Sequence, residues 1–173
     1  MKAFVSAMML AANMSPALAA TITPASVESI SAALKVTSAL MNDIGAAEQP
    51  TVRALARSQS VSDRLKSTQD FICFEILAQN ATNLMQYVST THKLAYINSL
   101  MRDPIDDGTS AAVLKIHLET LTSSMSPKAS ADTLADSCYA NKDIRDSASR
   151  YKETFTYVEG IFAPIARRLG VKP

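Results

Sequence analysis

The feature that most constrains the fold is a three- and four-residue spacing of apolar side chains that recurs along most of the chain. It is clearest near the C-terminus, where one face of a predicted helix carries Ile144, Ala148, Tyr151, Phe155, Val158, Phe162, Ile165 and Leu169. This spacing matches the turn of an amphipathic α-helix. Alternating strand patterns are nearly absent, and no Asn-Gly or Asp-Gly hairpin separates two apolar runs. The chain is therefore expected to be all-α.

Turn and capping residues divide the first half of the chain into helices. Thr23 and Pro24 are typical of a helix N-terminus, and Gly45 is typical of a helix end. A second, weaker helical segment is expected to begin at Pro50 and to include Val61 and Leu65. A third helix is expected over residues 68–89, followed by a bend or a break near Thr90 and Thr91, where the apolar stripe changes phase.

The second half contains the clearest turn, at residues 103–109, which is followed by a further predicted helix and a shorter one carrying Cys138. Asn141 is expected to cap the last helix. That helix should bend between Gly160 and Pro164 without stopping. Short connections make consecutive helices antiparallel neighbours, so the sequence predicts an up-and-down bundle of five to six helices in one domain, residues 20–173.

The N-terminus has the pattern of a secretory signal peptide. Lys2 precedes an apolar run, and a small-x-small motif ends at Ala19. We expect residues 1–19 to be removed, with Ala20 as an alternative cut, and the mature protein to be exported to the periplasm or secreted. The alternative, an uncleaved membrane anchor, is disfavoured because the apolar run is shorter than the roughly 20 residues that a membrane span needs.

Cys73 and Cys138 are the two cysteines of the chain, and both lie in the predicted mature part. An even cysteine count in an exported protein predicts one disulfide. The alternative is a pair of free buried thiols. The bond would close a loop of roughly 65 residues and stabilise the fold by about 4 kcal/mol in the chain-entropy model.

The charge balance argues against a polyanionic partner. The chain has 17 basic and 16 acidic residues, and removal of Lys2 makes the two counts equal. A protein that binds nucleic acid or an anionic membrane normally shows a basic excess on one face. The most basic stretch comprises Arg53, Arg57, Arg64 and Lys66, and we interpret it as a solvated helix face. We expect no nucleic acid partner and no membrane insertion after signal cleavage.

No motif in the sequence predicts a cofactor, a metal or a catalytic site. The two histidines, His92 and His117, lack a metal-ligand spacing. A calcium loop beginning at Asp103 fails because its last position is Leu114, where a bidentate Glu belongs. No haem-attachment motif and no nucleophile motif with its partner elements occur. We therefore expect a protein without enzymatic activity.

Binding is the function that remains, and the last helix offers a candidate surface for it. Tyr157 and Ile161 lie beside the buried stripe and widen the apolar band, which can mark a surface for a protein partner or for self-association. Alternatively, this helix is central and buried on two sides. We expect an envelope-complex component or an inhibitor of a secreted protein. The other hypothesis is a bundle that binds a small ligand, a metal or haem near Gly160 and Pro164.

Overall fold

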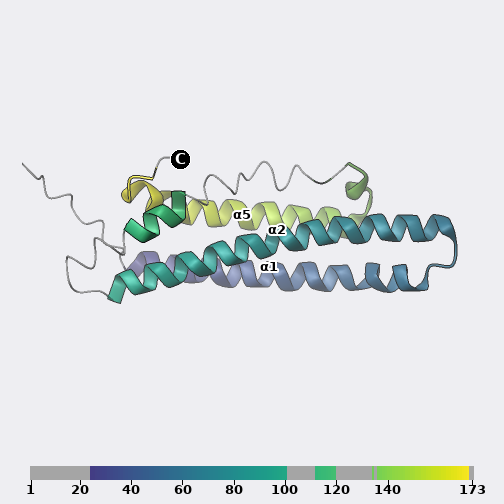
Figure 1. Ribbon diagram of the computed structural model, residues 1–173, viewed down its shortest axis with the longest axis horizontal. Coiled ribbons are helices and arrows are strands. Elements are labelled where there is room, and N and C mark those ends of the chain that lie inside the picture. Colours follow the sequence, from purple (N-terminus) through teal and green to yellow (C-terminus); the bar gives the residue numbers. More distant parts are fainter. Residues whose placement is uncertain (1–23, 101–111, 120–133, 135, 172–173) are drawn as a thin grey trace, which may run out of the picture.

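The computed structural model describes residues 24–100, 112–119, 134 and 136–171 (Figure 1). Within these residues the chain forms α1 (Pro24–Arg57), α2 (Val61–Leu100), a helix at residues 112–119, the 3-10 turn η1 (Asp136–Ala140) and α5 (Lys142–Arg168). The described residues contain no strand, which confirms the all-α prediction. The predicted signal segment and the turn at 103–109 lie outside the described residues.

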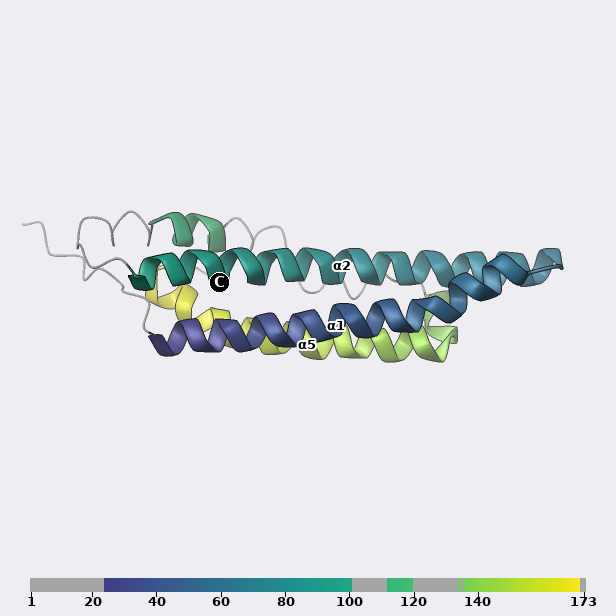
Figure 2. The ribbon, with the colours of Figure 1, turned by 90° about the horizontal axis from the view of Figure 1, so that it is seen from below.

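The long helices lie side by side as an elongated bundle. α1 and α2 form an antiparallel hairpin that residues 58–60 close. α5 packs against both, antiparallel to α1 and parallel to α2 (Figures 1 and 2). At 1.5 Å per residue, the 34 residues of α1 and the 40 residues of α2 span about 50 and 60 Å. The closed end of the hairpin extends past the point where α5 begins (Figures 1 and 2).

The first helix begins at Pro24 as expected, but the later boundaries expected in the first half were wrong. α1 continues through Gly45 and Pro50 to Arg57. Pro50 is exposed, so its ring points to solvent, and the loss of one backbone hydrogen bond is offset by the buried face that α1 presents to α2. The chain instead breaks at residues 58–60. There the Ser60 hydroxyl oxygen accepts a hydrogen bond from the Asp63 N–H at 3.0 Å and caps α2.

The expected break near Thr90 and Thr91 is absent, because α2 continues to Leu100. Its buried stripe keeps a regular three-four spacing through Phe74, Leu77, Ala81, Leu84, Val88, Thr91 and Ala95. Thr91 takes an apolar position while its hydroxyl donates to the Tyr87 carbonyl at 2.9 Å. Ile97, two residues after Ala95, lies off this stripe and is 45% exposed. A buried threonine therefore concealed the continuity of the pattern. Because segments expected to be separate helices are continuous, the described residues form four helices, fewer than the expected five to six.

Most of the stripe of α5 is buried against α1 and α2, and both the predicted cap at Asn141 and the predicted continuation through Pro164 are confirmed. Asn141 caps its N-terminus, with Oδ1 accepting from the Asp143 N–H at 2.9 Å. Pro164 lies inside the helix, which continues to Arg168. Gly170 then adopts a left-handed φ of 71°, and the Val171 N–H bonds the Ala166 carbonyl at 2.9 Å, which closes the helix end.

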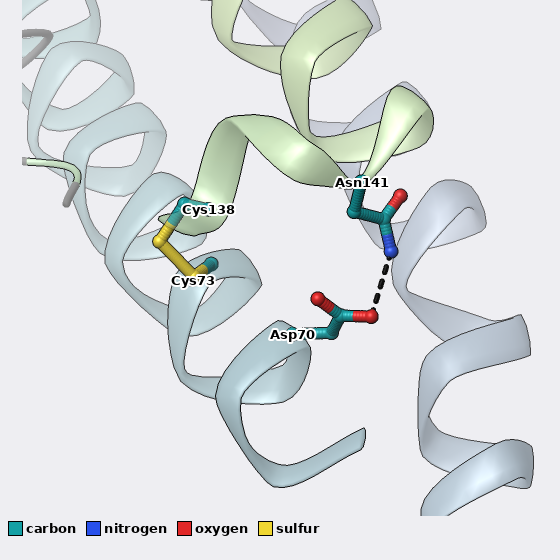
Figure 3. The surroundings of a disulfide bond; sticks show 4 residues. All are labelled: Asp70, Cys73, Cys138 and Asn141. Carbon is teal, nitrogen blue, oxygen red and sulfur yellow. Dashed lines mark hydrogen bonds between the residues drawn. A yellow bond between two sulfur atoms is a disulfide. The ribbon is translucent and has the colours of Figure 1, made fainter. Parts of the chain in front are cut away.

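The disulfide predicted from the cysteine count is present. Cys73 of α2 and Cys138 of η1 are bonded, with their Cα atoms 5.8 Å apart and a sequence separation of 65. A hydrogen bond lies close by, from Asn141 Nδ2 to Asp70 Oδ2 at 2.8 Å (Figure 3). Together these two contacts fix the beginning of α5 to the early part of α2.

Candidate functional site

The surface expected on α5 is smaller in the structure than the sequence indicated. Tyr157 is 44% exposed, whereas Ile161 is half-buried and packs against the core. The wide apolar band of α5 is explained mainly by its position, since the helix contacts both α1 and α2. Tyr157 therefore offers a single exposed ring, not a continuous apolar face.

The region proposed for a ligand between helices has a solvent-facing side, whereas Phe162 within it is buried. Gly160, Ala163 and Pro164 are all exposed. A side chain built on Gly160 would meet no atom within 4 Å. The solvent-facing side of the helix at this point offers little enclosure for a small molecule.

The exposed end of the α1–α2 hairpin carries several exposed aliphatic and basic side chains close together in sequence. We call residues 52–66 the hairpin tip. It includes Val61 and Leu65, which are 78% and 68% exposed and lie one helical turn apart on α2, and Val52 of α1 is also exposed. Ile72 continues the stripe two turns further along α2 and is exposed as well. Apolar side chains exposed together at one end of a molecule suggest a binding surface.

The same tip gathers four basic side chains. Arg53 and Arg57 lie on the last turns of α1, Arg64 and Lys66 on the first turns of α2, and all four are exposed. Asp63 is the one acidic residue in this segment. Among the described residues, Arg53, Arg57 and Lys66 form no ion pair, so their charges face solvent.

Hydrogen bonds give the tip a defined shape. The Ser58 hydroxyl donates to the Ala54 carbonyl at 2.8 Å, and Arg64 Nη2 donates to the Ser58 carbonyl at 3.3 Å. The Ser60 hydroxyl donates to Asp63 Oδ2 at 2.7 Å in addition to capping α2. These bonds fix the path of the backbone through the turn and the position of the Arg64 side chain.

The exposure of the tip follows from where α5 begins. Asn141, the cap of α5, meets α2 at Asp70, and Cys138 meets it at Cys73 (Figure 3). α2 begins nine residues before Asp70, at Val61. α5 therefore starts too far along the bundle to cover the first two turns of α2, which leaves Val61 and Leu65 in solvent.

A second cluster lies toward the other end of the bundle, where the helix at 112–119 packs against α2. His117 Nε2 lies 3.2 Å from Thr91 Oγ1, and its ring is 5.9 Å from the ring of Tyr87. The Thr91 hydroxyl proton is used in the bond to the Tyr87 carbonyl, so Nε2 of His117 acts as the donor toward Thr91. Phe162 of α5 meets Tyr87 edge to face at 5.0 Å.

The ionisation of this cluster follows from its burial. Burial lowers the pKa of His117, and a hydrogen bond with the backbone of Tyr87 partly opposes this. Burial, and then the negative charge of Glu159, raise the pKa of the Tyr87 phenol well above its usual value. Both side chains are therefore held neutral near pH 7. They join the 112–119 helix to the bundle.

Two carboxyl groups meet between α1 and α2, away from this cluster. Partial burial, followed by the charge and hydrogen bond of Glu75, raises the pKa of Glu48. No third ligand completes a site there, because the described residues contain no group of three or more His, Cys, Asp or Glu side chains that could hold a metal ion. His92 and His117 belong to no such group.

The sequence analysis identified the basic residues of the tip but did not predict that exposed aliphatic side chains lie near them. The signal was present in Arg53, Arg57, Arg64 and Lys66, but the helix break was placed near Gly45 instead of at residues 58–60. Arg53 and Arg57 were therefore assigned to the same helix face as Arg64 and Lys66, although the two pairs lie on different helices.

In the described parts of the chain, none of the helices has the length and apolar character needed to cross a membrane. Comparison with known proteins gives no assignment, since no protein-family model, no curated protein and no solved structure matches this chain.

Proposed function

We propose that this protein acts by binding and not by catalysis, and that the hairpin tip is its binding surface for a partner with an acidic surface. The observation that carries the proposal is the combination, on one exposed turn, of four basic side chains with the aliphatic side chains of Val61 and Leu65. Arginine is enriched in protein interfaces, and burial of exposed aliphatic groups provides affinity.

The energetic contribution of the aliphatic part is substantial on the scale of a binding reaction. Complete burial of a valine or leucine side chain contributes about 1.5 to 3 kcal/mol. Val61 and Leu65 are largely exposed in the free protein, so most of this free energy is still available to a partner. The charged groups would then fix the orientation of the partner and raise the association rate.

The compartment belongs to the same proposal. We propose that the mature chain, residues 20–173, is exported and acts in the periplasm or outside the cell. The Cys73–Cys138 disulfide supports this, because such bonds persist mainly in oxidising compartments. An envelope-complex component or an inhibitor of a secreted protein would fit both the compartment and the tip.

Site-specific photocrosslinking tests the binding surface. A photoreactive amino acid replaces Val61 at the tip in one variant and Tyr157 on α5 in another, and both are expressed in the native host. We expect a crosslinked adduct from position 61, with a protein or with lipid, that is lost when Arg53→Gln and Arg57→Gln are added. A product from position 157 alone would move the binding surface to α5 and contradict the proposal.

The chain offers a matched control for the charge change. Arg167→Gln with Arg168→Gln also removes two exposed positive charges close to a helix C-terminus, so any loss of favourable interaction with the helix dipole is at least as large as for Arg53 and Arg57. This pair lies at the opposite end of the bundle from the tip (Figure 1). The control variant should keep the position-61 product.

A further inference from the structure

We infer that the hairpin tip docks on an anionic phospholipid surface, with its basic side chains among the lipid headgroups and Val61 and Leu65 at the boundary with the acyl chains. This inference rests on the proposed function, because it names the acidic partner of the same surface. It describes binding at the surface of a bilayer, with no segment crossing it.

The shape of the tip allows it to reach a flat surface. The hairpin ends in a tight turn of residues 58–60 that projects beyond α5 (Figures 1 and 2). The turn and the helix ends beside it can therefore approach a bilayer without interference from α5, and lipid headgroups can rearrange around the side chains that reach them.

The charges of the tip match this partner. Arg53, Arg57, Arg64 and Lys66 face a single acid, Asp63, whose carboxylate is engaged by the Ser60 hydroxyl at the α2 N-terminus. Each basic residue close to an anionic bilayer strengthens binding about fivefold. Clusters of four or more such residues are typical of proteins that bind acidic lipids.

The aliphatic residues supply the second part of an interfacial site. Val61 and Leu65 are separated by four residues, so they lie on the same face of α2. Arg64 precedes Leu65 and Lys66 follows it, so the apolar face is bordered by cations. Apolar residues bordered by basic ones characterise helices that lie at the headgroup boundary.

Vesicle flotation with the disulfide-bonded mature protein tests the inference. Vesicles contain phosphatidylcholine alone or with about 30 mol% phosphatidylglycerol, at salt concentrations of about 0.1 M and about 1 M. We expect binding to the phosphatidylglycerol vesicles at low salt only. Arg53→Gln with Arg57→Gln should weaken it about 25-fold, from two fivefold losses. The control pair Arg167→Gln with Arg168→Gln should change it less than about twofold.

A second variant separates the aliphatic part from the charges. Val61→Ser with Leu65→Ser leaves every tip charge in place and should also weaken vesicle binding. All the substituted side chains are exposed, so each variant should retain the helical circular dichroism spectrum and the melting temperature of the wild type. These measurements exclude loss of fold as the cause of a change in binding.

The outcomes distinguish this inference from the proposed function. Equal binding of the tip variant and the wild type to anionic vesicles would overturn the lipid assignment, as would absence of wild-type binding. If the protein does not bind vesicles but crosslinking at position 61 yields a protein product that depends on Arg53 and Arg57, an acidic protein is the partner and the proposed function stands. If neither experiment depends on Arg53 and Arg57, both are wrong.

Discussion

Reduction of the Cys73–Cys138 bond should lower the free energy of unfolding by about 4 kcal/mol. The bond joins positions 65 residues apart in sequence, and the enclosed chain contains most of α2, the helix at 112–119 and part of η1. Cross-linking restricts this long loop in the unfolded chain, and the restriction is released when the bond is broken.

The magnitude follows from the length of the loop. With 65 residues, the chain-entropy relation gives about 14 cal/mol/K, or about 4 kcal/mol at 25 °C. For a domain of this size each kcal/mol corresponds to about 2 to 4 °C, so the melting temperature should fall by roughly 10 °C. A compact denatured state would reduce both values, because its loop is already partly restricted.

Urea unfolding of the oxidised and the reduced wild-type protein measures this difference. Both forms keep the same buried side chains at positions 73 and 138, so the comparison isolates the covalent bond. The variant Cys73→Ala with Cys138→Ala serves as the control and should not respond to reductant. A difference below about 1 kcal/mol between oxidised and reduced wild type would refute the entropic reasoning.

Three further perturbations test the packing of the bundle. His117 has a lowered pKa in the folded protein, so the unfolded chain binds more protons, and the stability that is present above about pH 6.5 should be lost as the pH falls through the folded-state pKa. Urea unfolding of the wild type and of His117→Gln between about pH 7 and pH 5 checks this, and an identical dependence of unfolding free energy on pH in the two proteins would contradict it. Phe74→Ala removes a fully buried ring and should cost about 3 to 5 kcal/mol in the same assay, so a loss below about 1 kcal/mol would show that the ring is not packed as described. Asn141→Ala removes both the cap of α5 and the bond to Asp70 and should cost about 1 to 2 kcal/mol, whereas Asp70→Ala keeps the cap and should cost less; the reverse order would be inconsistent with the capping role.

The periodic parts of the sequence predicted helices correctly, and the errors concern where those helices end. Gly45 and Pro50 are residues that often end helices, but α1 passes through both, and its residues beyond Ile44 that face α2 are only half-buried. Thr91 looked like a change of phase, but its hydroxyl is satisfied within the helix and its side chain is buried. Local propensity alone therefore does not decide where the helix ends at any of these three positions.

The candidate binding surface was only partly accessible from the sequence. The basic residues were visible, and Val61 and Leu65 were assigned to a weak amphipathic segment with a buried face. Their exposure depends on α5 beginning near Asp70, which a contact across the bundle determines. By contrast, Ile161 was expected at the surface with Tyr157, and packing against the core leaves it half-buried.

The sequence by itself determined the helical class, the pairing of Cys73 with Cys138 and the cap at Asn141. These properties depend on neighbouring residues or, for the disulfide, on there being two cysteines to pair. Only the tertiary structure decided that two long helices form a hairpin, that α5 lies parallel to α2, and that the hairpin tip remains uncovered. Each of these depends on contacts between residues far apart in the chain, and no local spacing encodes which face another helix will cover.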